Sequence, residues 1–286
     1  MMKLRKIYLS STVFIILSQA SSGYSKCPEE PHSQNITELA EIINGESRKR
    51  VLPGTGGLYE AVGFITNNFY MECTGTLIGP RHVLTAAHCI YNPLTCERAK
   101  TVTFYPGYNG HKGSFEAQTH IVSEIFESPR EFSEFSGVLK APYDIAIIIL
   151  PEPIEIQYIP VKRFDFNFRM QRVLGLGIPA DKYGDQMGLW QEEQNPMEVF
   201  IPETMASPGV DPRFARLFRN VFDVASGQSG GPFVSFDENE DPFIFGINLA
   251  TSRSLTPTSP IVQFGVGMYF DDYIYGFITD MLAKYP

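Results

Sequence analysis

The chain has 286 residues, of which 43% are apolar and 13% aromatic, enough to bury a substantial core in one large β domain or two smaller lobes. Its 24 Gly and 21 Pro residues favour many short strands and turns over long helices. The formal net charge of −9 argues against nucleic acid as a partner, because the phosphates would repel an acidic protein.

The N-terminus is predicted to be a secretory signal peptide spanning residues 1–20. Basic residues within 3–6 precede the apolar run 7–17, and residues 18–20 (Ser-Gln-Ala) offer a small-x-small cleavage site, with a second one at residues 23–25. The apolar run is too short to span a bilayer comfortably, and no other run is long enough. We therefore expect a secreted, extracellular protein with no membrane association once the signal is removed.

Residues 21–50 are predicted to be a polar pro-segment. A processing protease could cut after Glu41, or alternatively after the basic cluster 48–50, just before Val51. A charged, solvated linker that is never cut explains the same composition. Asn35 begins an N-glycosylation sequon, which has meaning only in a eukaryotic source.

The first half of the body reads as β structure from Tyr59 onward. Asn109-Gly110 is a hairpin signal, and residues 127–142 are expected to form a largely polar loop. The expected strands cover residues 61–66, 69–71, 76–78, 83–85, 101–105, 120–126 and 145–150.

The second half continues the β pattern and ends in a helix. Residues 179–196, with Trp190, are expected to form a long loop. Apolar pairs at helical spacing predict a terminal helix over 270–284, with Asp271 as its N-cap. The expected strands cover residues 173–178, 197–201, 218–223, 233–236, 243–249 and 262–268.

Two side chains in the first half are candidates for acid–base chemistry. Ala86 and Ala87 leave little bulk around His88, so its imidazole could face open space. Asp144 precedes the apolar run 145–150, so its carboxylate would be buried and would need a donor, which the His88 Nδ1–H can supply. Taken alone, such a histidine is more often structural, and such an aspartate is more often a turn residue.

A candidate nucleophile lies in the glycine-rich turn 226–232. Ser229 can attack only if a base lies within hydrogen-bond reach and a third group orients that base, and His88 and Asp144 can fill these two roles. The backbone amides of Gly227 and Ser229 can point to one spot and hold a developing oxyanion. A Gly/Ser turn without catalysis is common, so the combination of all three segments carries the prediction.

Four cysteines in an exported chain suggest disulfide bonds, with three possible pairings. Cys73 and Cys89 flank the His88 segment, and a bond between them would clamp it. Cys27 and Cys96 would then either pair with each other or stay unpaired.

These segments together resemble the chymotrypsin-fold serine endopeptidases, and most of all their bacterial glutamyl endopeptidase branch. The order His, Asp, Ser along the chain is the chymotrypsin order. The resemblance runs over most of residues 42–282 and is dense only at the catalytic segments. The matching residues are Cys73-Thr74-Gly75, Leu77-Ile78-Gly79-Pro80, Thr85-Ala86-Ala87-His88-Cys89-Ile90-Tyr91, Pro106-Gly107, Asn109-Gly110, Tyr143-Asp144 and Gly227-Gln228-Ser229-Gly230, with residues 42–51 resembling the start of that branch's mature chain.

The resemblance implies an all-β fold of two antiparallel six-stranded barrels, the first over residues 51–160 and the second over residues 161–286 with the short terminal helix. The barrels would pack at right angles with the site between them. The resemblance also implies His88 as general base and acid, Asp144 as its orienter and Ser229 as nucleophile, with an oxyanion hole formed by the residue 227 and 229 amides.

Three positions bear on activation and specificity. Gln228 stands where trypsin-like zymogens carry an Asp that pairs with the new N-terminal amine, which argues against that activation switch. Asn248 stands where the glutamyl enzymes have a histidine that reads the substrate carboxylate, and its amide brings no positive charge. Asp223 lies six residues before Ser229, the spacing of the trypsin pocket's carboxylate, but it is equally compatible with a structural turn.

We therefore predict a secreted serine endopeptidase that cleaves protein or peptide substrates through an acyl-enzyme. We expect a monomer without a cofactor, and no metal in catalysis because the five histidines lack paired spacing. Structural calcium stays open. The alternative is a catalytically inactive binding module of the same fold. A secreted esterase also fits the bare Gly-x-Ser-x-Gly pattern, but its residue order would differ.

Overall fold

The structure is a computed structural model that describes residues 46–92, 95, 97–108, 121–134, 141–164, 172–182, 186–194, 216–254 and 262–286. Several predictions lie outside these residues: the signal peptide, the pro-segment up to residue 45, the Asn35 sequon, Cys27, Cys96, the hairpin at Asn109-Gly110 and the strand 197–201.

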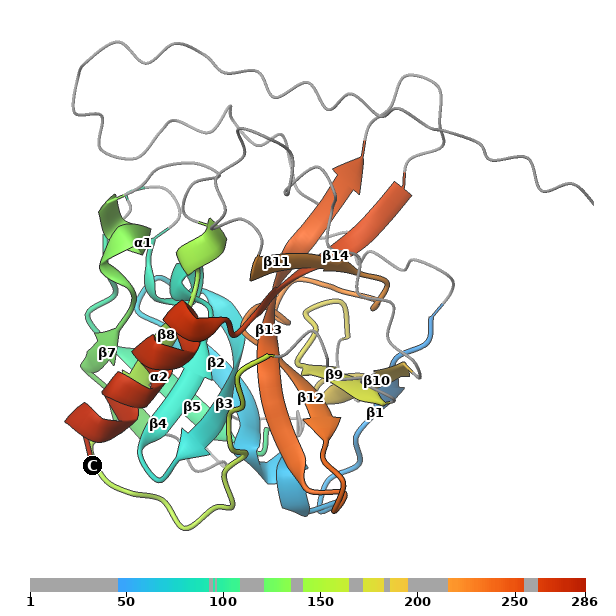
Figure 1. Cartoon of the computed structure of the whole chain (residues 1–286), viewed down its shortest axis with the longest axis horizontal. Coiled ribbons are helices and arrows are strands. Elements are labelled where there is room, and N and C mark those ends of the chain that lie inside the picture. The colour runs from blue at the N-terminus through green and yellow to red at the C-terminus, as the bar shows by residue number, and fades with distance from the viewer. Residues whose placement is uncertain are drawn as a thin grey trace, which may run out of the picture.

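The first lobe is a seven-stranded antiparallel sheet (Figure 1). Its strands are β2 (Val62–Asn67), β3 (Glu72–Gly79), β4 (His82–Thr85), β5 (Val102–Pro106), β6 (Ile121–Ser123), β7 (Ile125–Glu127) and β8 (Ala146–Ile149), in the order β6-β5-β2-β3-β4-β8-β7. The two edge strands, β6 and β7, are separated along the chain only by Glu124, so the sheet curls back on itself.

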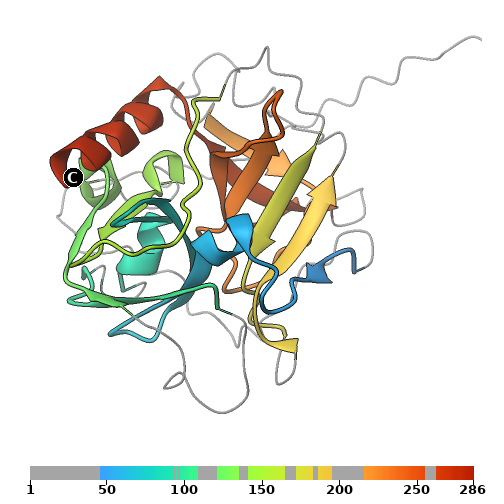
Figure 2. The same ribbon diagram turned by 90° about the horizontal axis from the view of Figure 1, so that it is seen from below.

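The second lobe is also a seven-stranded antiparallel sheet, and Figure 2 shows the two sheets side by side. Its strands are β1 (Lys49–Arg50), β9 (Val173–Gly177), β10 (Trp190–Gln194), β11 (Leu217–Asn220), β12 (Pro232–Phe236), β13 (Pro242–Ser254) and β14 (Val262–Tyr269), in the order β1-β10-β9-β12-β13-β14-β11. Its strand β1 comes from the N-terminal side of the first lobe, so residues just before position 51 belong to the second sheet.

The predicted all-β class with a C-terminal helix is confirmed, although each sheet has seven strands where we expected six. The extra strand of the second sheet is β1. In the first sheet the predicted strand 120–126 divides at Glu124 into two strands that pair with different neighbours, β5 and β8. Side-chain alternation alone did not reveal that break.

The terminal helix α2 (Asp272–Lys284) begins where predicted, with the Asp271 side chain accepting a hydrogen bond from the Ile274 amide at 2.9 Å. Although α2 follows the second sheet along the chain, it packs on the first (Figure 1). The Tyr285 hydroxyl donates to Glu127 of β7 at 3.1 Å, and Leu282 lies over Gly79 of β3. The C-terminal segment therefore ties the two lobes together.

Three other local predictions were wrong. Residues 69–71 form a turn rather than a strand, because the Asn67 side-chain oxygen accepts from the amides of Phe69 and Met71 and fixes the chain reversal. The expected loop 179–196 contains strand β10, whose alternating burial is hidden in the sequence by its Gln and Glu residues. The expected loop 127–142 contains a short helix, α1 (Arg130–Glu134).

The core occupies the interior of both lobes. Strand β8 is buried along its whole length, as its run of isoleucines predicts. The second lobe adds a separate phenylalanine-rich cluster that includes Phe218, Phe233 and Phe245, whose rings pack on one another. Within the described residues, no helix has the length and apolar character needed to cross a membrane.

Candidate active site

His88 is presented at the end of β4, in the short 3-10 helix η2 (Ala87–Ile90). Ala86 and Ala87 are fully buried, whereas the His88 side chain stays 33% exposed. As the sequence predicts, the small side chains of Ala86 and Ala87 leave one edge of the imidazole exposed.

Asp144 holds His88 at two points. Its Oδ1 accepts from the His88 backbone amide at 2.8 Å, and its Oδ2 lies 2.7 Å from Nδ1 of the imidazole. Asp144 itself sits just before β8, and its side chain is only 13% exposed. The two bonds fix both the position and the ring orientation of His88, and they leave Nε2 available on the other side.

The pKa of His88 is raised above its ordinary value. Burial alone would lower this pKa, but the negative charge of Asp144 and its hydrogen bond to Nδ1 together outweigh that effect. The imidazole is therefore a stronger base than a free histidine.

Ser229 is brought beside His88 by contacts between the two lobes. Its carbonyl oxygen accepts from the amide of Thr74 in β3 at 2.9 Å. The Thr74 hydroxyl donates to the Gly227 carbonyl at 2.8 Å and accepts from the Ile178 amide at 3.0 Å. A single buried threonine of the first lobe thus fastens the serine turn of the second.

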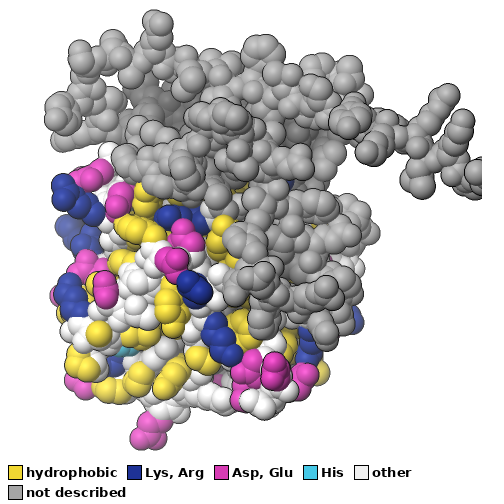
Figure 3. All heavy atoms as spheres, in the orientation of Figure 1, with side chains coloured by type: hydrophobic (Ala, Val, Ile, Leu, Met, Phe, Trp, Pro, Cys, Tyr) yellow, Lys and Arg dark blue, Asp and Glu magenta, His cyan; other side chains and the backbone are white. Residues whose placement is uncertain are grey.

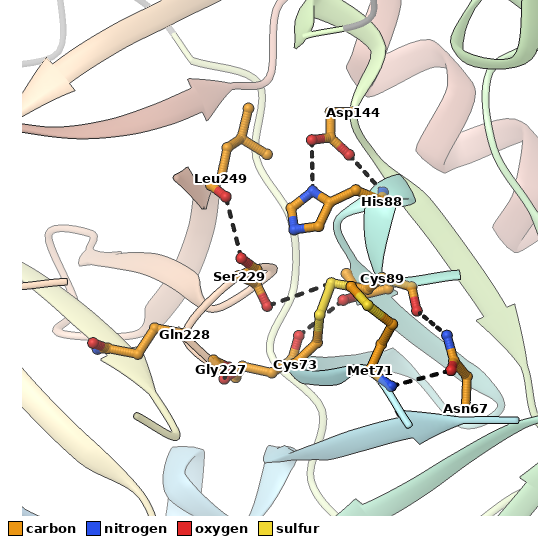
Figure 4. The surroundings of a disulfide bond; sticks show 12 residues. Asn67, Met71, Cys73, His88, Cys89, Asp144, Gly227, Gln228, Ser229 and Leu249 are labelled. Carbon is orange, nitrogen blue, oxygen red and sulfur yellow. Dashed lines mark hydrogen bonds and ion pairs between the residues drawn. A yellow bond between two sulfur atoms is a disulfide. The ribbon is translucent and has the colours of Figure 1, made fainter. Parts of the chain in front are cut away.

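Figure 4 shows the imidazole of His88 lying between Asp144 and Ser229, with its second nitrogen on the serine side. The Ser229 hydroxyl donates to the carbonyl oxygen of Leu249 at 3.2 Å. The structure therefore brings the three predicted residues together, with the serine hydroxyl turned to the β13 backbone.

Two backbone amides of the serine turn are left without an acceptor in the described part of the chain. Gln228 and Gly230 use their amides in hydrogen bonds, but those of Gly227 and Ser229 have no such partner. Gly227 has a φ of 87°, and a Cβ there would lie 2.4 Å from the Ile178 carbonyl oxygen, so only glycine fits. Unpaired amides beside a nucleophile are what stabilisation of an oxyanion requires.

The two predicted substrate-binding residues both have structural partners. The Asp223 carboxylate accepts from the amide and the hydroxyl of Ser47, at 2.9 and 2.7 Å, and its amide donates to Glu192. The Asn248 side-chain nitrogen donates to the Gln228 carbonyl at 3.1 Å. Both residues line a small pocket in the second lobe, and their roles in specificity stay predictions.

The predicted disulfide joins Cys73 and Cys89 beside the candidate site (Figure 4). It links β3 to η2, the two elements that carry Thr74 and His88. These sulfurs and the imidazole nitrogen lie within 4.8 Å of one another, but sulfurs bonded to each other offer no thiolate for a metal ion. The disulfide is therefore a clamp on the site.

We expect the double substitution Cys73→Ala/Cys89→Ala to lower the melting temperature. A disulfide that closes a loop of this length stabilises by about 3 kcal/mol in the chain-entropy model, which corresponds to roughly 6–12 °C for a domain of this size. Differential scanning calorimetry of the two proteins checks this. Equal melting temperatures would show that the bond does not stabilise the fold.

Two residues that position the site were not singled out from the sequence. Thr74 lies inside the Cys-Thr-Gly motif, but nothing there indicates that its hydroxyl bridges to the other lobe. Arg48 belongs to the basic cluster 48–50, which we interpreted as either a processing site or a solvated linker, and the structure instead places its side chain in a buried network next to Gln228. The acidic residue Glu46, two positions before Arg48, was the one sequence feature that could have indicated an ion pair there.

Comparisons with a family model, with individual proteins and with solved structures all match this chain to serine proteases of the same fold. Residues 54–271 match the family model described as Trypsin. Glutamyl endopeptidase from Bacillus licheniformis is 25% identical over 227 residues, which span 78% of this chain but only 64% of that relative. Trypsin from Simulium vittatum is 34% identical over 91 residues, 32% of each chain. The solved structure titled "Structure of Glu endopeptidase in complex with MPD" has the same fold, with a TM-score of 0.64 and 22% identity over 85% of this chain and 99% of that chain.

Proposed function

Because the chain belongs to the trypsin family of serine proteases, whose fold the sequence resemblance implied, we propose that it is a secreted serine endopeptidase acting through an acyl-enzyme. The observation that carries the proposal is the pair of hydrogen bonds by which Asp144 orients His88 next to Ser229. The amides of Gly227 and Ser229, which have no acceptor among the described residues, add the group that would hold the developing charge.

The reaction starts when the Ser229 hydroxyl turns from Leu249 to His88. Nε2 takes the hydroxyl proton as Oγ attacks the peptide carbonyl, and the carbonyl oxygen becomes an oxyanion held by the amides of Gly227 and Ser229. Protonated His88 then gives its proton to the departing amine, and the C–N bond breaks. Water repeats the sequence with His88 as base, which frees the acid product and Ser229.

Asp144 acts by orienting and by charge rather than by taking the proton. Its Oδ2 accepts the Nδ1–H, which keeps Nε2 as the lone-pair nitrogen that faces Ser229. The same carboxylate stabilises the imidazolium that forms after proton transfer, which is why it raises the pKa of His88.

Secretion and a peptide substrate complete the proposal. The predicted signal peptide and the Cys73–Cys89 bond both suit an oxidising compartment outside the cell. On the face shown in Figure 3, basic and acidic side chains of the described residues are interleaved, which favours a peptide over a polyanion as substrate. We propose a monomer.

We expect the pH dependence of peptide hydrolysis to follow the protonation of the His88 imidazole. Only neutral imidazole can accept the serine proton, so kcat/KM should fall as the pH drops through the His88 pKa, at a pH above the ordinary histidine value of about 6.5. A kcat/KM profile from pH 5 to 9 measures this. A rate that is greatest at pH 5 and declines toward pH 8 would contradict the assignment of His88 as base.

The proposal is tested by incubating the processed protein with a defined peptide library and identifying the products by mass spectrometry. We expect new N- and C-termini at internal peptide bonds, and the residues before the cut give the specificity. The inactive binding module predicts an unchanged library. Hydrolysis of ester substrates alone, with the peptides intact, would indicate an esterase.

A further inference from the structure

Arg48 is a buried cation, with only 4% of the residue exposed. A buried guanidinium is costly unless carboxylates neutralise it and accept its hydrogen bonds. Glu46 accepts from Nε and Nη2 at 2.8 and 2.9 Å, and Asp181 accepts from Nη1 and Nη2 at 3.1 and 2.7 Å. The hydrogen bond from Arg48 is the main reason why the pKa of Glu46 is lowered to about 2.

The remaining contact of Arg48 leads to the serine turn. Its Nη1 donates to Oε1 of Gln228 at 3.2 Å, and that same oxygen accepts from the Ala225 amide at 2.8 Å. Gln228 is itself buried and stands between Gly227 and Ser229, whose amides face no acceptor in the described residues. The guanidinium therefore fixes the one side chain that separates the two free amides.

Arg48 also supports the turn from its other flank. Asp181 follows Ala180, whose amide donates to the carbonyl of Ser226 at 2.7 Å. The planar guanidinium bonds Asp181 and Gln228 through the same nitrogen, so it sets the spacing between the 179–182 segment and the turn. Arg48 therefore supports the serine turn on both sides of Gly227, through Asp181 on one side and through Gln228 on the other.

We propose that Arg48 is a positioning residue for the oxyanion hole: through Gln228 and Asp181 it holds the Gly227 and Ser229 amides where the developing charge appears. The proposal rests on the proposed function. Without this support the two N–H groups would point in a different direction. Because they are aimed at the charge that develops on the oxygen, this change weakens binding of the transition state more than binding of the substrate.

The location of Arg48 also restricts processing. It directly precedes β1, whose residues Lys49 and Arg50 pair with Gln191 and Trp190 of β10. A cut after residue 48, 49 or 50 would separate the guanidinium from the rest of the chain. Any activating cut therefore lies before Arg48, and every fully active species retains residues 48–50.

The test uses Arg48→Met in the full chain, which keeps side-chain length and removes the donors. With a peptide amide chosen from the library profile, we expect kcat to fall by about 10- to 100-fold while KM stays within about twofold. Affinity for the matching peptide aldehyde, whose hemiacetal carries the oxyanion, should fall by the same factor as kcat/KM. Binding of the peptide product should not change.

A second variant, Gln228→Met, removes the acceptor while leaving Arg48 its two carboxylate partners, so it should fold even if Arg48→Met does not. We expect the same pattern of lower kcat and weaker aldehyde binding. Arg172→Met is the matched control, because it removes an arginine from another carboxylate pair of the second lobe, with Glu193, away from the turn. Its kcat should equal that of the wild type.

Folded Gln228→Met or Arg48→Met protein with wild-type kcat and aldehyde affinity would overturn the proposal. So would a fully active species whose N-terminus, sequenced by mass spectrometry, is Val51. A variant whose KM and product affinity change as much as its kcat would show a general structural role instead. If the wild type itself neither cleaves peptides nor binds the aldehyde, the proposed function has failed, which is a different result.

Discussion

Replacing Ser229 with alanine is expected to reduce kcat for peptide hydrolysis by about a million-fold, the scale of effect seen when a serine nucleophile is removed from a triad. The residual rate comes from substrate binding and the oxyanion amides alone. The substitution removes a single hydrogen bond, to the Leu249 carbonyl, so the free energy of unfolding should change by only about 1 kcal/mol and the melting temperature by a few degrees.

The measurement combines kcat from a fluorogenic peptide with a calorimetric melt of the same samples. Ser133→Ala is the matched control, because that hydroxyl also bonds one backbone carbonyl, but in α1 on the surface. It should keep full activity. Peptide hydrolysis by Ser229→Ala at the wild-type rate would show that Ser229 is not the nucleophile.

The second large effect is expected for Asp144→Asn, which should lower kcat by about ten-thousand-fold. The present carboxylate accepts two hydrogen bonds, from the His88 amide and from Nδ1–H. An asparagine amide has only one oxygen. If the oxygen keeps the backbone amide, the NH₂ group faces Nδ1, which must then be the lone-pair nitrogen, and Nε2 carries the proton and cannot act as base.

This variant should also lower the pKa of His88, since the negative charge that raises it is gone. A titration of the imidazole by NMR in Asp144→Asn and in the wild type therefore separates the charge effect from the tautomer effect on kcat. Asp280→Asn, at an exposed position of α2, removes an equal charge and should change neither quantity. An unchanged His88 pKa in Asp144→Asn would contradict the geometry described here.

Most of the strands were predictable because local patterns report burial. The isoleucine run of β8 and the β-branched and aromatic residues of β2 and β12 predicted those strands to within one residue. The failures share a cause. Strand β1 has only two residues and β10 carries four Gln and Glu side chains, so their pairing depends on partners distant in the sequence.

The candidate site was partly predictable for a similar reason. His88, Asp144 and the glycine turn each have a local signature, and their approach in space follows from the family fold. The network around Arg48 has no such signature, because its partners Asp181 and Gln228 lie 133 and 180 residues away. The same holds for Asp223, whose Ser47 partner lies 176 residues away.

The central claim is that the oriented imidazole of His88 can activate the Ser229 hydroxyl, beside two amides that have no acceptor in the described part of the chain. A fluorophosphonate probe tests it directly, because it reacts with a serine only when base and oxyanion support are both in place. We expect one adduct per molecule of folded, processed protein, located on Ser229 by tandem mass spectrometry and absent from heat-unfolded protein. No adduct on the folded protein, or an adduct on another residue with Ser229 unmodified, would contradict the account.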